Sequence, residues 1–369
     1  MPSVIPTENK VRAVLARFNA LTEEDKSNYT RAGRRLGMDH KSIRRYVEQY
    51  GPAYGAGPVE ATPETLTKVS EAIEWVNQID EDDLPVDEIV AQHKRQFAMK
   101  KAYEEASKLL KVKVKIDGPI GLLHFGDPHV DDDGTDLALM DRHSDLTHVE
   151  GVFGCNVGDT TNNWIGRLAR LYAAQSMSRP RAIKVAERFI QRTRWLYMLA
   201  GNHDMWSGAD DPMVWIARQA RTVYKSSEIR VGLQFPSGLE VRINARHDFD
   251  GASQWNPVHG LMKAASLGTR DHLLVAGHRH ISGEGMVKDP TTGIICHCLR
   301  VASYKAFDRY AKERGFRDQS CGPAAFTVIN TKLPETHPDL IKVYWDPEEG
   351  VDYLTFLRKR ASAQAKRAA

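Results

Sequence analysis

Short apolar runs alternate with helical stretches through most of the chain beyond residue 112. The first five runs predict β-strands, at 120–125, 152–157, 195–200, 239–245 and 272–276. Residues at helical spacing predict helices between these strands, near 177–193, 212–221 and 257–267. Three later runs predict strands with little helix between them, at 294–299, 324–329 and 341–345. Strands and helices that alternate in this way indicate a layered α/β domain.

The chain before residue 112 has a different pattern. Residues 1–50 predict short helices, and the stretch 51–63 is rich in proline and glycine, which predicts a linker. Helices near 64–79 and 86–110 predict a helical spacer. We therefore expect five parts along the chain: an N-terminal module (1–50), a linker (51–63), a spacer (64–111), a main domain (112–350) and a basic C-terminal tail (351–369).

Five polar clusters each follow one of the first five predicted strands. They are Asp127-Pro128-His129, Gly158-Asp159, Gly201-Asn202-His203-Asp204, a lone His247 and Gly277-His278-Arg279-His280. Loops at strand ends are where α/β folds gather functional groups from distant parts of the sequence. Carboxylate, amide and imidazole ligands suit Mn²⁺, Fe²⁺, Zn²⁺ or Ni²⁺. Two adjacent metal ions are a common device for attacking a phosphate ester, so the clusters predict a phosphoester hydrolase.

These five blocks, in this order, resemble the calcineurin-like metallophosphoesterase superfamily. Its pattern is Asp-x-His, Gly-Asp, Gly-Asn-His-Asp/Glu, His and Gly-His-x-His, and the resemblance covers about residues 118–345. It implies an α/β fold, a four-layer αββα sandwich, to which this chain adds a small all-α helix-turn-helix module. The second block departs from a common family form, because Asn162 and Asn163 stand where another acid often occurs.

The resemblance also implies a role for each residue of the blocks. One metal would be held by Asp127, His129, Asp159 and His280, and the other by Asp159, Asn202, His247 and His278. A hydroxide that bridges the two ions, most simply Mn²⁺, would attack phosphorus. His203 would stabilise the transition state or protonate the leaving oxygen, and Asp204 would orient His203. His259 is the rival of His247 as a ligand.

Residues 28–47 resemble a helix-turn-helix, with Gly37 at the turn and Asp39 as the cap of the second helix. The basic bias of this stretch favours nucleic acid, most simply DNA, as the partner. The residues expected to contact it are Arg34, Arg35, His40, Lys41, Ser42, Arg44 and Arg45. The alternative is a helical hairpin for protein contacts or dimerisation, and a homo-oligomer stays open.

Side chains next to the blocks supply candidate substrate contacts. They are Trp164, Arg167, Trp206 and Arg279, and the two tryptophans are also candidates for packing. The acids at 131–133 resemble a metal site in isolation, but a charge run is more often a solvated loop, which is what we expect here.

Composition adds limits. The 369 residues are 41% hydrophobic and 27% charged with a net charge of +3, which is ordinary for a soluble protein. No apolar run approaches the roughly 18 residues that cross a bilayer, and the first residues lack a signal pattern, so we expect a cytoplasmic protein without a membrane partner. The four cysteines are expected to be structural.

The two halves together predict a nucleic-acid phosphodiesterase, such as a DNA exonuclease, an endonuclease or another DNA-processing phosphoesterase. A tethered binding module would raise the local concentration of phosphodiester at the active site. One alternative keeps the chemistry and changes the substrate to a cyclic nucleotide or a phosphoprotein. Another is a catalytically silent DNA-binding regulator, which has no need of a complete ligand set.

Overall fold

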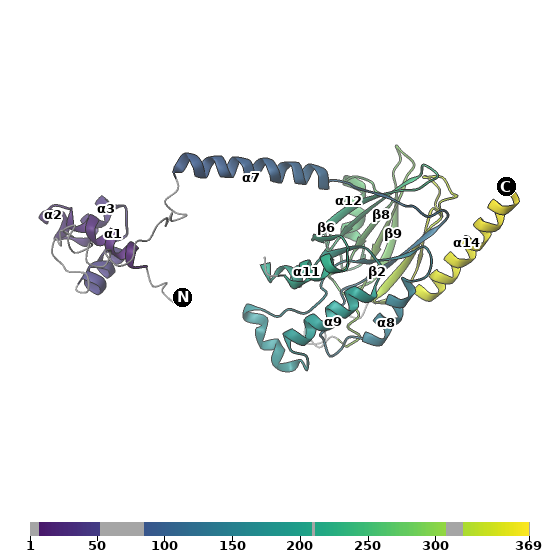
Figure 1. Cartoon of the computed structure of the whole chain (residues 1–369), viewed down its shortest axis with the longest axis horizontal. Helices are drawn as coiled ribbons and strands as arrows, with labels where there is room; N and C mark the ends of the chain where they lie inside the picture. Colours follow the sequence, from purple (N-terminus) through teal and green to yellow (C-terminus); the bar gives the residue numbers. More distant parts are fainter. Residues whose placement is uncertain (1–6, 52–84, 209–210, 308–319, 369) are drawn as a thin grey trace, which may run out of the picture. The chain divides into compact units, whose positions relative to one another are not determined.

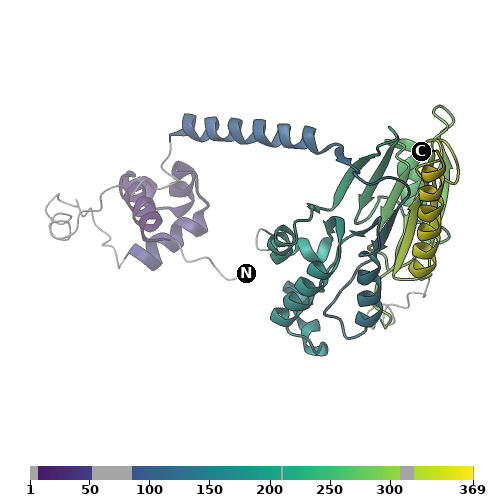
Figure 2. The same ribbon diagram turned by 45° about the vertical axis from the view of Figure 1, so that its right-hand side comes forward.

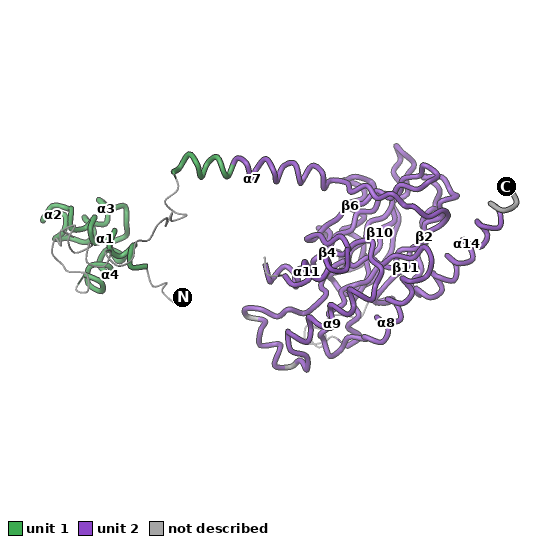
Figure 3. Tube along the Cα trace, viewed as in Figure 1, with its two compact units in different colours: residues 1–93 green, residues 94–369 purple. Residues whose placement is uncertain are grey.

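The computed structural model describes residues 7–51, 85–208, 211–307 and 320–368 (Figure 1). The chain divides into two compact units, residues 1–93 and 94–369 (Figure 3). The predicted linker beyond Gly51 and the predicted helix at 64–79 lie outside the described residues.

The first unit contains a small helical bundle. Its elements are α1 (Glu8–Asn19), α2 (Glu23–Lys26), α3 (Tyr29–Leu36), α4 (His40–Arg45) and a π-helical turn η1 (Tyr46–Tyr50). Val11, Phe18, Ala32 and Ile43 are among the residues of its apolar core. This confirms a small all-α module at the N-terminus.

The turn between α3 and α4 follows from its sequence. Gly37 ends α3 in the left-handed region at φ 68°, where glycine has no steric penalty. Asp39 then accepts the backbone N–H groups of Lys41 and Ser42, and this caps α4 as expected. A side chain at Gly33 would come within 2.5 Å of the carbonyl oxygen of Met38, so only glycine lets the chain fold back this closely. Helix α7 (Val86–Ser107) follows, and none of its residues is buried.

Two six-stranded mixed sheets form the second unit. One has the order β1-β6-β7-β8-β10-β9, and its strands are β1 (Leu110–Lys113), β6 (Glu228–Gln234), β7 (Glu240–Arg246), β8 (Leu273–Ala276), β10 (Ile295–Arg300) and β9 (Gly283–Lys288). The other has the order β12-β11-β2-β3-β4-β5, and its strands are β12 (Ile341–Tyr344), β11 (Ala324–Ile329), β2 (Ile120–Phe125), β3 (Val152–Asn156), β4 (Trp195–Ala200) and β5 (Tyr224–Ser226). Strands β2, β3, β4 and β5 run parallel, as do β7, β8 and β10.

Three apolar layers hold the sheets and helices together. The largest lies between the sheets, where Leu122 and Leu199 of one pack with Ile243 and Val275 of the other. A second layer, which includes Phe189, lies under helices α8 (Leu137–Leu146), α9 (Arg179–Arg192), α11 (Pro212–Gln219) and α14 (Pro347–Ala368). A third lies under α12 (His259–Leu267) on the outer face of the other sheet. The result is the predicted αββα sandwich, in which helices cover both outer faces.

The predicted separation of a C-terminal tail at residue 351 is wrong. Helix α14 runs through this point and contacts β11, β2 and α8 (Figure 2). Val351 and Leu354, three residues apart on one face, are buried in the core. Further along, Arg358 donates hydrogen bonds to the carbonyl oxygens of Asp117 and Pro119, so at least this part of the basic segment belongs to the domain.

Among the described residues, no helix is both long enough and apolar enough to cross a membrane.

Candidate metal centre

The five polar clusters all follow the carboxyl ends of strands. Asp127, Asp159 and Asn202 come two or three residues after β2, β3 and β4, which are parallel neighbours. His247 and His278 follow β7 and β8, which are parallel neighbours in the other sheet. Since the two sheets pack face to face, these loops meet at one end of the sandwich.

Asp159 lies at the centre of the cluster. Its Oδ1 accepts the backbone N–H of His203 at 2.9 Å, which leaves Oδ2 facing three imidazoles. Oδ2 lies 3.9 Å from Nε2 of His129, 3.9 Å from Nε2 of His203 and 3.3 Å from Nε2 of His247. Two groups of potential ligand atoms share this residue, one with His129 and His203 and the other with His247 and His278.

His247 is oriented by the chain itself. Its Nδ1 lies 2.9 Å from the carbonyl oxygen of Val157, so Nε2 is directed into the cluster. There Nε2 lies 2.9 Å from Oδ1 of Asn202 and 3.0 Å from Nδ1 of His278. Burial would lower the pKa of His247, but Asp159 outweighs it and raises the pKa to about 10. The surroundings of this ring therefore favour positive charge.

The side chains of Asp127 and His129 are buried without hydrogen-bond partners among the described residues. Both carboxylate oxygens of Asp127 and both ring nitrogens of His129 are buried with no hydrogen-bond partner in the described part of the chain. The nearest charge partner of Asp127 is Nε2 of His280, 3.4 Å from its Oδ2. Burial raises the pKa of Asp127 to about 7 and holds the pKa of His129 well below its usual value. Buried polar atoms are rarely left unpaired, and a bound cation would satisfy the carboxylate oxygens of Asp127 and one ring nitrogen of His129. The donor set therefore fits a metal ion.

The backbone at the cluster is unusual. His129, Asp159, His278 and His280 all have positive φ, between 39° and 69°, a region that non-glycine residues rarely occupy. Each such residue is held there at a cost of order 1–3 kcal/mol. Four predicted ligands in this conformation indicate that the fold gives up stability to aim their side chains.

Two glycines allow the close approach. A Cβ atom on Gly201 would come within 2.1 Å of Oδ1 of Asp159, and one on Gly277 within 2.6 Å of Oδ1 of Asp127. Any other residue at these positions would displace a predicted ligand.

The orienting group of His203 differs from the expected one. Nδ1 of His203 lies 2.6 Å from the carbonyl oxygen of Asn162, not beside Asp204. Asp204 instead accepts the backbone N–H groups of Gly201 and Thr160, so it fixes the turn that carries His203. Burial and then the nearby Asp159 raise the pKa of Asp204, and burial lowers the pKa of His203. The prediction that Asp204 orients the imidazole is wrong, and this function belongs to Asn162.

Of the acids at 131–133, Asp133 is exposed as we expected of a solvated loop, but Asp131 and Asp132 are not. Asp131 is fully buried and accepts the backbone N–H of Asn162 at 2.7 Å. Asp132 accepts the Asn162 side-chain amide at 3.0 Å and forms an ion pair with Lys305 at 3.1 Å. Gln175 donates to Asp131 as well. These contacts hold Asn162, and through it His203, in place.

Two indoles flank His203. The ring centroid of Trp206 lies 4.1 Å from that of His203, and the centroid of Trp164 lies 5.1 Å away on an edge-on approach. Trp164 is anchored because its Nε1 donates to Gln175 at 2.9 Å. Both indoles are partly exposed. The side chain of Arg167 lies outside the described residues, and that of Arg279 forms an ion pair with Asp248 at 2.9 Å.

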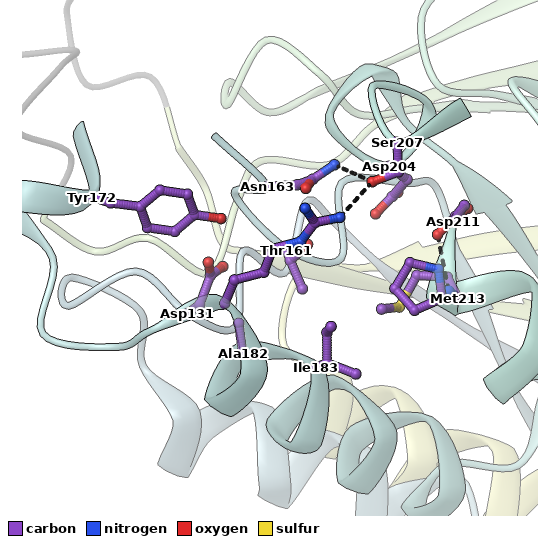
Figure 4. A pocket seen from close by; sticks show the side chains of 12 residues that line it. Asp131, Thr161, Asn163, Tyr172, Ala182, Ile183, Asp204, Ser207, Asp211 and Met213 are labelled. Carbon is purple, nitrogen blue, oxygen red and sulfur yellow. Dashed lines mark hydrogen bonds between the residues drawn. The ribbon is translucent and has the colours of Figure 1, made fainter. Parts of the chain in front are cut away.

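A small pocket with both polar and apolar lining residues lies next to the turn that carries His203 (Figure 4). Asp131, Tyr172 and Asp204 are among its lining residues. Asn163 and Arg179 also line it, and both donate to the hydroxyl of Ser207. None of the predicted metal ligands lines the pocket, so the pocket is not the metal centre itself.

The predicted nucleic-acid contacts lie on α3, on α4 or next to them. Arg34, His40, Lys41 and Arg45 are exposed. Three other members of the set have partners inside the module: Arg35 pairs with Asp25, Arg44 with Glu48, and the hydroxyl of Ser42 donates to Asp39. His259, the rival ligand, begins α12, whereas His247 lies in the cluster.

No protein-family model matches this sequence, and no curated protein is significantly similar to it. Among solved structures, the chain is similar to wild-type Vps29 complexed with Zn²⁺ from Entamoeba histolytica, with 13% identity, a TM-score of 0.30, and coverage of 61% of this chain and 97% of that one. It is also similar to a hypothetical protein from Thermus thermophilus, with 14% identity, a TM-score of 0.32, and coverage of 61% of this chain and 98% of that one. The assignment of the fold rests on the two sheets and not on these likenesses.

Proposed function

We propose that this chain is a dinuclear-metal phosphodiesterase of the calcineurin-like metallophosphoesterase superfamily that acts on nucleic acid. The observation that carries the proposal is the placement of Asp159, which belongs to both groups of ligand atoms. A carboxylate shared in this way can bridge two ions. The unpaired carboxylate oxygens of Asp127 and a ring nitrogen of His129 support it, since a cation would give these atoms a partner.

The residues of the cluster divide between two ions. Asp127, His129, Asp159 and His280 would hold one, and Asp159, Asn202, His247 and His278 the other. We propose Mn²⁺ as the occupant, with Fe²⁺, Zn²⁺ and Ni²⁺ as alternatives for this donor set. When bound, two such ions polarise phosphoryl oxygens and lower the pKa of water to near neutrality.

The remaining chemistry belongs to the chain. The Asn162 carbonyl accepts Nδ1–H of His203, so Nε2 is the nitrogen left to hold or deliver a proton. That nitrogen lies 3.9 Å from Oδ2 of Asp159, at the edge of the ligand cluster. We propose that His203 stabilises charge on the phosphoryl group or protonates the leaving oxygen.

Two features support nucleic acid as the substrate. The helical module exposes Arg34, Lys41 and Arg45, which suit a phosphate backbone. Trp164 and Trp206 flank His203 where unpaired bases could stack. We propose that residues 1–50 bind DNA, that residues 51–111 connect this module to the catalytic domain, and that tethering raises the local substrate concentration.

Hydrolysis assays test this function. The full chain with Mn²⁺ should cleave bis-p-nitrophenyl phosphate and DNA, and EDTA should abolish both activities. Asp159→Asn should be inactive, whereas Asp352→Asn, an exposed carboxylate on α14, should match the wild type. Cleavage of only p-nitrophenyl phosphate or a cyclic nucleotide would contradict nucleic acid as the substrate. If none of these esters is hydrolysed, the proposal that the chain is an enzyme is wrong.

A further inference from the structure

Arg300 is the largest side chain in the fully buried set, although it is charged. It ends β10, and each of its three guanidinium nitrogens donates a hydrogen bond. Nε donates to the carbonyl oxygen of Pro257 at 2.8 Å, Nη1 to that of Gly277 at 2.5 Å, and Nη2 to Oδ1 of Asp248 at 2.8 Å. A buried charge is tolerated only when it is paired and hydrogen-bonded in this way.

Asp248 joins this arginine to a second one. Its Oδ2 accepts Nε of Arg279 at 3.1 Å and Nη2 at 2.9 Å. The two oxygens of one carboxylate therefore bind two guanidinium groups. Contacts of this kind, between ionised groups with fixed geometry, are stronger and more directional than neutral hydrogen bonds.

The contacts connect the two ligand loops of one sheet. Asp248 is the neighbour of His247, while Arg279 lies between His278 and His280. Gly277, whose carbonyl Arg300 holds, also donates its N–H to the carbonyl oxygen of His247 at 3.1 Å. These bonds together fix the 247–248 loop relative to the 277–280 loop.

We propose that Asp248, Arg279 and Arg300 form a positioning cluster that sets His247 against His278 and so preforms the metal site that these two histidines share. The inference rests on the proposed function, because it assumes that the histidines bind a cation. In this proposal Arg279 holds the loop in place and does not contact the substrate, because its guanidinium already binds Asp248. Mutation of a residue that hydrogen-bonds to a metal ligand or orients it commonly lowers metal affinity by about 10–100-fold.

Metal titration by calorimetry, together with thermal unfolding in EDTA and in Mn²⁺, tests the cluster. Asp248→Asn removes the charge but keeps the shape. Asp250→Asn is the matched control, because this exposed acid on the same loop forms its ion pair with Lys263, outside the cluster. We expect one of two Mn²⁺ sites to weaken by about 10–100-fold in Asp248→Asn and neither to change in Asp250→Asn.

A purely structural role would lower the melting temperature in EDTA but leave both affinities intact, and this result would overturn the proposal. If Asp248→Asn does not fold, Arg279→Gln, with a partly exposed side chain, decides instead, and Arg279→Lys should recover part of the lost affinity. Equal binding by Arg279→Gln and the wild type would then overturn it. A wild-type chain that binds no Mn²⁺ at all would refute the proposed function, which is a separate outcome.

Discussion

The metal centre and the N-terminal module both consist of polar residues that sequence patterns single out. They differ in whether these side chains are buried and whether they have hydrogen-bond partners. In the centre, Asp127 and His129 are buried and without a hydrogen-bond partner within the described residues. In the module, the basic residues are exposed, and Arg35 and Arg44 already have acidic partners. Buried side-chain atoms without a hydrogen-bond partner indicate a particular ligand, here a cation. Exposed positive charge indicates only that the partner carries negative charge.

The sharpest test of the centre is His203→Ala. Loss of an acid–base group should lower kcat on a phosphodiester by about 10²–10⁴-fold while both metals stay bound. Geometry makes this test necessary, because His203 also offers a potential ligand atom in one group with His129 and Asp159. Loss of one metal from the variant, measured by elemental analysis, would show that His203 is a ligand rather than an acid.

Replacing Arg34, Lys41 and Arg45 together by glutamine tests the module. DNA affinity should fall, and the slope of log K against log salt should decrease by about 0.9 for each duplex phosphate that the variant no longer neutralises. Hydrolysis of bis-p-nitrophenyl phosphate should not change. Arg31→Gln is the control, because Arg31 pairs with Glu24. An unchanged salt slope would favour the protein-contact alternative for the hairpin.

Trp206→Leu probes the aromatic surface beside His203, where we propose that unpaired bases stack. Base stacking is worth about 1–3 kcal/mol per base, so single-stranded DNA should bind about 5–150-fold more weakly in EDTA, where we expect no hydrolysis. Trp255, which is 91% exposed, gives the matched control Trp255→Leu. Equal binding by the two variants would mean that Trp206 only packs against His203.

The smallest expected effect is on stability. Burial raises the pKa of the Asp127 carboxyl to about 7 despite the nearby His280, so the ionised carboxylate is disfavoured in the metal-free fold. At pH 7 and above, Asp127→Asn should therefore stabilise the metal-free protein by about 0.5–2 kcal/mol. The same variant should lose the stabilisation that Mn²⁺ gives the wild type. Denaturant unfolding in EDTA and in Mn²⁺ measures both. A less stable apo variant would mean that the fold itself requires the Asp127 carboxylate.

The sequence is most informative where chemistry depends on side-chain type. The five blocks are recognisable because each follows an apolar run, and parallel strands bring such ends together. Strands β1, β5, β6 and β9 are missing from the prediction. Three of them, β1, β5 and β9, are edge strands with no fully buried residue, whereas β6 alternates polar and apolar residues, a pattern typical of a half-buried strand that the search for continuous apolar runs passes over. The boundary predicted inside helix α14 is wrong because the charges around residue 351 mask the buried pair Val351 and Leu354.

Other parts of the site leave no usable pattern in the sequence. Asn162 orients His203 through its backbone carbonyl, which any residue possesses. Asp248 and Arg300 are 52 positions apart and meet only because β7, β8 and β10 are neighbours in one sheet. Asp248 directly follows the predicted ligand His247, and this position is the one feature of the sequence that could have pointed to its role.

Crystals grown with excess Mn²⁺ test the central claim most directly, by anomalous scattering at the manganese edge. Two peaks about 3.5–4 Å apart, with Asp159 between them, are the result that we predict. A map with no peak at the ends of β2, β3, β4, β7 and β8, or with a single peak that Asp159 does not contact, would contradict the dinuclear centre and the hydrolase that depends on it.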